Sequence, residues 1–163
     1  MWNIFHEVVA AGDTYAFDPG MSREEALAYW FEAGTHTYVA ENDQRVVGTY
    51  ILRANQAGPG CHVANAAYMV ARDARGLGVG RKMAEHSLSE ALRLGFRAMQ
   101  FNFVVSTNAS AIHVWQQLGF KIVGTLPGAF AIPGRDMSMF TSCFAGYCSR
   151  ASALPSRSFC EGS

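Results

Sequence analysis

Apolar side chains recur twice at helical spacing near the start of the chain. The first run predicts a helix over residues 2–11, which ends at Gly12. The second predicts a helix over residues 22–33, because Ser22 is a good N-cap and Glu25 follows at the spacing of a capping box. Each helix therefore has an apolar face that can pack against another layer.

Strand-like runs and two more helices follow. The predicted strands cover residues 37–40, 46–52, 63–70, 98–105 and 121–125, and the predicted helices follow the segments 76–80 and 107–110. The first two strands are separated by residues 41–44 and predict a hairpin. The order of the elements predicts an α/β (α+β) fold in which helices cover both faces of one mixed sheet.

Composition narrows the class of protein. The chain has 163 residues, half of them hydrophobic, which fits one domain with one core. Its 13 Lys and Arg balance 13 Asp and Glu, so a nucleic-acid partner is not expected. No apolar run is long enough to span a membrane, and the start lacks the features of a signal peptide. We therefore expect a cytoplasmic protein without a membrane partner.

The cysteines carry no motif. Cys61, Cys143, Cys148 and Cys160 form neither a CxxC pair nor a cluster with zinc spacing. We therefore expect no bound metal, and free thiols.

A glycine-rich segment, Gly76, Gly78 and Gly80, stands between a predicted strand and a predicted helix. Such glycines let the backbone approach an anion, and the following helix N-terminus attracts negative charge, so a pyrophosphate fits here. The Gly-Lys-Ser/Thr ending of a P-loop is absent, as is the acidic residue of a dinucleotide fingerprint. The alternative is a tight turn that requires glycine.

With a second motif further along, the chain resembles the Gcn5-related N-acetyltransferase (GNAT) superfamily. The matches, within residues 2–134, are Arg75-x-x-Gly78-x-Gly80 after a strand, Asn108 before a helix, and Leu118-Gly119-Phe120. The resemblance implies the GNAT fold, a mixed, mostly antiparallel sheet with helices on both faces and a splayed central pair of parallel strands. It also implies acetyl-CoA as the donor.

The resemblance also implies which residues bind that donor. They are Met69 and Val70 at the end of a strand, the segment Arg75, Gly76, Leu77, Gly78, Val79, Gly80 and Arg81 at the pyrophosphate, and Asn108 near the pantetheine arm. A backbone N–H at Met69 or Val70 would polarise the thioester carbonyl.

The acid and the base of many superfamily members are missing. Where those members carry a tyrosine that protonates the leaving thiolate, this chain has Trp115, which we interpret as a core residue. Tyr68, a water or no protein group would then serve as the acid. The common glutamate base is absent from residues 63–70.

A narrower resemblance concerns the acceptor. The runs 62–66, 100–104 and 124–130, with Asn108, are similar to acetyltransferases that detoxify azetidine-2-carboxylate and other proline analogues. This implies that Asn65 and the backbone near Phe103 contact the substrate carboxylate, that Asn102 supports the site, and that Asn108 is catalytic. Such amides can orient a zwitterionic amino acid by hydrogen bonds.

These acceptor residues also have structural interpretations. Asn65 and Asn102 could be buried amides with ordinary partners. Tyr15 and Phe17 are predicted to line the acceptor pocket, with core packing as the alternative.

The two ends differ from the superfamily pattern. The superfamily begins with a strand, whereas residue 2 already lies in a predicted helix, so the first strand is missing; a later start of the chain would explain this. Residues 135–163 form an atypical Ser- and Cys-rich tail where a long final strand is expected. We hypothesise a frameshift near Asp136, which makes the last strand doubtful and would expose its neighbour's edge. The acetyltransferase domain is then residues 1–134.

The sequence therefore predicts an N-acetyltransferase that moves acetyl from acetyl-CoA directly to the amine of a small amino acid or a toxic amino-acid analogue. One alternative is a CoA-binding module with little turnover. Another is an enzyme that acetylates a protein N-terminus or side chain. A homodimer is compatible with each of them.

Overall fold

The computed structural model describes residues 1–132 and 141–149. The strands are β1 (His36–Asn42), β2 (Arg45–Ala54), β3 (Val63–Val70), β4 (Ala98–Val105), β5 (Lys121–Phe130) and β6 (Thr141–Ser149). The helices are α1 (Trp2–Ala10), α2 (Arg23–Trp30), α3 (Val79–Arg93) and α4 (Ala109–Gln117), with short 3₁₀ turns at Gly58–Gly60 and Arg72–Ala74.

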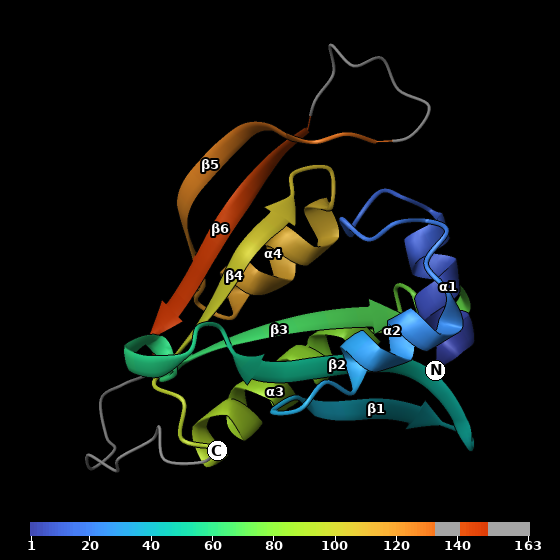
Figure 1. The fold of residues 1–163 in the computed structure, drawn as a ribbon, viewed down its shortest axis with the longest axis horizontal. Helices are drawn as coiled ribbons and strands as arrows, with labels where there is room; N and C mark the ends of the chain where they lie inside the picture. Colours follow the sequence, from blue (N-terminus) through green and yellow to red (C-terminus); the bar gives the residue numbers. More distant parts are fainter. Residues whose placement is uncertain (133–140, 150–163) are drawn as a thin grey trace.

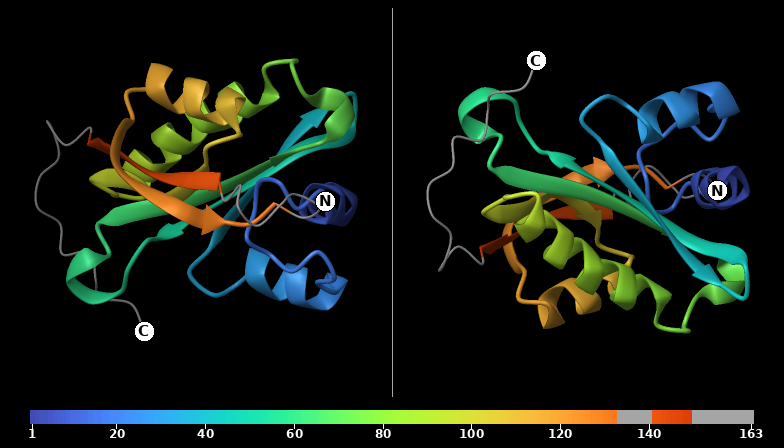
Figure 2. Two further views of the ribbon diagram at one scale, coloured as in Figure 1. Left: turned by 90° about the horizontal axis from the view of Figure 1, so that it is seen from above. Right: turned by 90° about the horizontal axis from the view of Figure 1, so that it is seen from below.

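The strands form a six-stranded sheet in the order β1-β2-β3-β4-β6-β5. β3 and β4 are parallel, and the other neighbouring pairs are antiparallel. Helices α1 and α2 lie on one face of the sheet, and α3 and α4 lie on the other (Figures 1 and 2). The mixed, mostly antiparallel sheet with helices on both faces is thus confirmed, and the described chain begins with α1 rather than with a strand.

The capping box predicted for α2 is confirmed. The Ser22 hydroxyl accepts the Glu25 N–H at 3.2 Å, and the Glu25 carboxylate accepts the Ser22 N–H at 2.8 Å. The helix ends at Trp30, three residues earlier than predicted, because Phe31 leaves helical geometry and Gly34 turns the chain at φ +79°.

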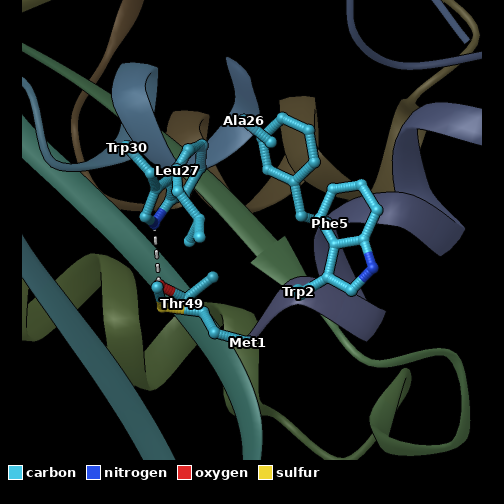
Figure 3. A pocket seen from close by; sticks show the side chains of 7 residues that line it. All are labelled: Met1, Trp2, Phe5, Ala26, Leu27, Trp30 and Thr49. Atoms are coloured by element: carbon cyan, nitrogen blue, oxygen red, sulfur yellow. Dashed lines mark hydrogen bonds between the residues drawn. The ribbon is translucent and has the colours of Figure 1, made fainter. Parts of the chain in front are cut away.

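Side chains of α1 and α2 pack on β2 and enclose a small apolar pocket (Figure 3). In this pocket the Trp30 indole N–H donates to the Thr49 hydroxyl at 3.1 Å, which fixes α2 over the sheet. The buried residues of this layer include Ile4, Phe5, Val8, Val9 and Ile51. A second core lies between the sheet and α3, and it includes Leu52, Met83, Leu88, Met99 and Phe101.

The turn between β1 and β2 is tighter than predicted. Asp43 and Gln44 have φ angles of +49° and +62°, the geometry of a two-residue hairpin turn of type I′. This geometry matches the twist of the flanking strands, so both strands extend further than the sequence pattern predicted.

The C-terminal part of the sheet bears on one expectation. The last strand, which the sequence left doubtful, is present: β6 pairs with both β4 and β5, so it covers an edge of each of them. Main-chain hydrogen bonds on both edges do not require the side-chain alternation on which the sequence-based prediction relied. The hypothesised frameshift near Asp136 and the domain boundary at residue 134 fall on residues 133–140, outside the described part.

The structure bears on what the sequence predicted about cysteines, metal sites and membrane spans. Cys61 is disulfide-bonded, so the expectation of free thiols is wrong for this cysteine. Within residues 1–132 and 141–149 there is no cluster of three or more His, Cys, Asp or Glu that could hold a metal ion. Over the same described ranges, every helix is too short or too polar to cross a membrane.

Candidate active site

The central parallel strands separate soon after they meet. Registered pairs join β3 to β4 only at Val63 with Ala98 and at Ala64 with Met99. At the next position the Asn65 side-chain amide donates to the Gln100 carbonyl at 2.9 Å, so a side chain takes over from the main chain. Beyond this link the strands splay apart, as predicted, and their facing edges form no further registered pairs (Figure 1). We call this interruption of the ladder the gap.

Strand register shows which main-chain groups of β3 face the gap. The Asn55 N–H donates to the Val63 carbonyl, and the Ala71 N–H donates to the Val47 carbonyl across the β2 side. Because the direction of hydrogen bonding alternates along an antiparallel pair, the odd-numbered residues of β3 bond β2. The main chain of Met69 therefore faces β2, whereas those of Tyr68 and Val70 face the gap.

The hydroxyl of Tyr15 occupies part of this free edge. It accepts the Tyr68 N–H at 2.8 Å and donates to the Tyr68 carbonyl at 2.7 Å. Burial raises the pKa of the Tyr15 phenol well above its ordinary value, so the hydroxyl keeps its proton. The Tyr15 side chain thus bonds the main-chain groups of Tyr68 that would bond β4 in a continuous sheet. It also connects the segment after α1 to the free edge of β3.

Replacing Tyr15 by phenylalanine should lower the free energy of unfolding by about 2 kcal/mol, because it leaves the Tyr68 N–H and carbonyl without their partner. Urea denaturation measures this loss. Tyr29→Phe is the matched control, since within the described part of the chain the Tyr29 hydroxyl takes part in one hydrogen bond, which it accepts from Arg53. Equal losses in the two variants would contradict a special role for the Tyr15 hydroxyl.

The glycine-rich loop leads from β3 into α3. Gly76 and Gly78 have φ angles of +78° and +77°, so both need the left-handed geometry that glycine adopts without strain. A Cβ added at either position would meet nothing within 4 Å, which leaves open space above the loop. The N–H groups of the first turn of α3 have no partner within the helix, and they suit the oxygens of a diphosphate.

Arg75 and Leu77 are exposed in the same loop. Arg81 pairs with Glu85 at 2.9 Å and donates to the Gln117 side chain at 2.8 Å. Arg81 thus joins the start of α3 to the end of α4.

Asn108 begins the helix that follows β4. Its side-chain oxygen accepts the Ala111 N–H at 3.3 Å and the Ser110 hydroxyl at 3.1 Å, so it acts as the N-cap of α4. Because β3 and β4 are parallel, Asn108 and the glycine-rich loop follow the same ends of the two splayed strands. The two motifs of the sequence are therefore brought to one end of the gap.

Asn102 and Phe103 lie on β4 where its pairing with β6 is irregular. The register shifts between Phe101 and Val104, which is the pattern of a β-bulge. In a bulge, successive side chains no longer alternate strictly between the two faces of the sheet. The Asn102 side-chain oxygen accepts the Gln100 amide at 3.3 Å, and Phe103 is 41% exposed.

Tyr68 and Trp115 pack together on the α3 side of the sheet. The Ser87 hydroxyl donates to the Ala84 carbonyl, so the Tyr68 hydroxyl donates its proton to Ser87 at 2.6 Å. Burial raises the pKa of Tyr68 well above its ordinary value. The ring centre of Trp115 lies 4.5 Å from that of Phe101 and 4.9 Å from that of Tyr68, so the partly buried indole packs against the core.

Sequence reasoning missed several residues near the gap. Gln100 supplies the carbonyl that Asn65 bonds, and Arg53 lies opposite Asn65 in the sheet. Tyr29 contacts Arg53. The only sequence signal for Arg53 was a charged residue directly after the apolar run of β2.

The splayed parallel pair has the glycine-rich loop after one strand and a capped helix after the other, both at the same end of the gap. This arrangement and the sequence motifs together indicate a CoA-dependent acyltransferase. The chain belongs to the acetyltransferase (GNAT) family, whose sequence profile matches residues 2–120. It is accordingly an N-acetyltransferase.

Known proteins agree with this assignment. N-acetyltransferase aca1 of Schizosaccharomyces pombe is 27% identical over 144 residues, which cover 78% of this chain and 69% of that protein. A GCN5-related N-acetyltransferase from Kribbella flavida is 40% identical, with a TM-score of 0.85, and the match covers 91% of this chain and 89% of that one. The acetyltransferase yncA from Salmonella typhimurium, solved with acetyl-CoA, shares the fold at 22% identity, with a TM-score of 0.82 over 96% of this chain and 90% of that one.

Proposed function

We propose that this enzyme transfers acetyl from acetyl-CoA to the amine of a small amino acid or amino-acid analogue, directly and within the gap between β3 and β4. The observation that carries the proposal is the gap itself, which has the glycine-rich loop and Asn108 at one end and the amide of Asn65 at the other. The solved structure of yncA with acetyl-CoA, a protein of the same fold, supports this donor.

Main-chain groups would supply most of the contacts to the donor. We assign the diphosphate to the segment Arg75, Gly76, Leu77, Gly78, Val79, Gly80 and Arg81, the pantetheine arm to the end of β3 at Met69 and Val70, and Asn108 to the same arm. Of Met69 and Val70, only Val70 directs its N–H into the gap, so we assign to it a hydrogen bond to a carbonyl of the donor. A preorganised N–H of this kind stabilises charge that develops on the carbonyl.

The residues around the gap would position the acceptor. In direct transfer, the acceptor nitrogen bonds to the acetyl carbon while the carbon–sulfur bond breaks, the nitrogen loses a proton and the thiolate gains one. Asn65, Asn102 and Phe103 would orient the acceptor on β3 and β4, with Tyr15 and Phe17 as its wall. Such positioning can contribute several kcal/mol.

Two of the predicted proton donors for the leaving thiolate are Tyr68 and a water. Tyr68 is the side chain with a hydroxyl, but it donates its proton to Ser87. We therefore propose that a water protonates the thiolate, and that Asn65 and Asn108 are the catalytic side chains.

The test is a substrate panel with purified protein and acetyl-CoA, read out as release of the CoA thiol. The panel contains azetidine-2-carboxylate, proline and the common amino acids, and calorimetry measures CoA binding. We expect release with at least one of these amines. Binding without release would favour a CoA-binding module, and release only with peptides would favour a protein acceptor.

Acetylation removes the charge of an amine, so an acetylated amino-acid analogue no longer resembles its natural counterpart. We therefore propose a detoxifying role, and we propose the cytoplasm as its place. We also propose a homodimer, which sedimentation velocity would distinguish from a monomer.

A further inference from the structure

We infer that Arg53 binds a carboxylate of the acceptor, so that the enzyme selects amines that carry a free carboxylate. This inference rests on the proposed function and names its substrate class. Arg53 is the cation in a wall of side chains, hereafter the acceptor wall, formed by Tyr15, Phe17, Tyr29, Arg53 and Asn65.

Ring contacts connect the acceptor wall from the gap to Arg53. The rings of Tyr15 and Phe17 lie 5.5 Å apart, and those of Phe17 and Tyr29 lie 5.0 Å apart. The guanidinium of Arg53 lies 4.7 Å from the centre of the Tyr29 ring and donates to the Tyr29 hydroxyl at 2.8 Å. Stacking on an aromatic ring and hydrogen bonding hold this planar fork in one orientation.

The sheet places Arg53 beside the predicted substrate amide. Arg53 on β2 is paired with Asn65 on β3, so their side chains are cross-strand neighbours on one face. Ile51, two residues earlier on β2, belongs to the core under α1 and α2, which identifies this face as the side of Tyr15.

Asn65 lies where the gap begins, directly after the last registered pair of β3 with β4, Ala64 with Met99. The carboxylate and the amine of an α-amino acid are separated by a single carbon atom. A carboxylate bound by Arg53 and Asn65 would therefore place the amine of the same molecule at this end of the gap. The acetyl carbon lies in that gap under the proposed function.

A carboxylate already contacts this guanidinium. The Glu32 carboxylate lies 2.6 Å from an Arg53 nitrogen, and the side chain of Glu32 is 60% exposed whereas that of Arg53 is 25% exposed. An exposed ion pair of this kind adds little stability, so Glu32 can give way to a carboxylate that Asn65 also binds. The bidentate fork of arginine matches a carboxylate in shape as well as in charge.

The test compares each acid with its amide. Azetidine-2-carboxylate and L-proline are measured beside azetidine-2-carboxamide and L-prolinamide, in the wild type, Arg53→Gln, Arg53→Lys and Arg93→Gln. Arg93 is the matched control, because it is an arginine paired with a glutamate, Glu90, near the end of α3. We expect the wild type and Arg93→Gln to prefer the acids at least tenfold in kcat/KM.

In Arg53→Gln we expect this preference to disappear, mainly through a higher KM for the acids. Arg53→Lys should keep part of the preference. Circular dichroism shows whether Arg53→Gln is folded. If it does not fold, Arg53→Lys provides the test: a reduced preference for the acids supports the inference, and an undiminished preference overturns it. An undiminished preference in both Arg53 variants, or no preference in the wild type, overturns the inference. A wild type that releases no thiol with any acceptor refutes the proposed function instead.

Discussion

Gly78→Ala should weaken the binding of acetyl-CoA at least tenfold, a loss of about 1.4 kcal/mol. Gly78 is the N-cap of α3 and has a φ angle of +77°. A methyl group there would meet no protein atom within 4 Å, so it would stand in the open space above the first turn of the helix. Under the proposed function that space belongs to the diphosphate. Calorimetry with acetyl-CoA measures the change in affinity.

Backbone strain needs its own control, because alanine in a left-handed conformation costs about 1–2 kcal/mol. Gly34 is a close match: its φ angle is +79°, and its added Cβ would also meet nothing within 4 Å. It lies between α2 and β1, far along the chain from the loop. Gly34→Ala should therefore lose a similar free energy of unfolding and keep its affinity for acetyl-CoA. Equal affinities in the two variants would argue against a diphosphate site at Gly78.

Asn108→Ala should lower turnover at least tenfold, which corresponds to about 1.4 kcal/mol of transition-state stabilisation. The side chain of Asn108 follows β4 at the open end of the gap, where we place the pantetheine arm. The same substitution removes the N-cap of α4, which costs about 1 kcal/mol of stability. Steady-state kinetics and urea denaturation on one preparation measure both effects.

Asn108→Asp separates the two roles of this residue. Aspartate keeps an oxygen that can accept the Ala111 N–H, and its charge is favourable at a helix N-terminus, but it lacks the amide N–H groups. We expect it to restore stability but not turnover. Recovery of both would assign the whole effect to capping and would refute a direct role of the amide in the reaction.

The central strands were the most predictable part of the fold. β3 and β4 have the bounds that the sequence predicted, residues 63–70 and 98–105, because each is a continuous strand-like run closed by turn residues. The capping box likewise located the start of α2. Local chemistry determines such features, so one sequence is enough to identify them.

Long-range contacts were out of reach of the same reasoning. The hydrogen bonds of Tyr15 to Tyr68 join residues 53 positions apart, and nothing near Tyr15 in the chain indicates them. β6 depends on two neighbouring strands rather than on its own side-chain pattern. Arg53 becomes a candidate only when the sheet places it opposite Asn65. For the site, the sequence indicated the type of chemistry, the glycine-rich loop and the acceptor residues Tyr15, Phe17 and Asn65. The other two residues of the acceptor wall, Tyr29 and Arg53, required the fold.

The short junction between β3 and β4 also bears on how the protein unfolds. Two registered pairs and the amide of Asn65 connect the half-sheet β1–β3 to the half-sheet β4–β6. Cooperativity between the halves must then come mainly from the packed layer that includes Leu52, Met99 and Phe101, which draws side chains from both. A substitution that creates a cavity in this layer should therefore raise amide hydrogen exchange in both half-sheets. The splay between β3 and β4 leaves few backbone bonds to join the halves independently of this layer.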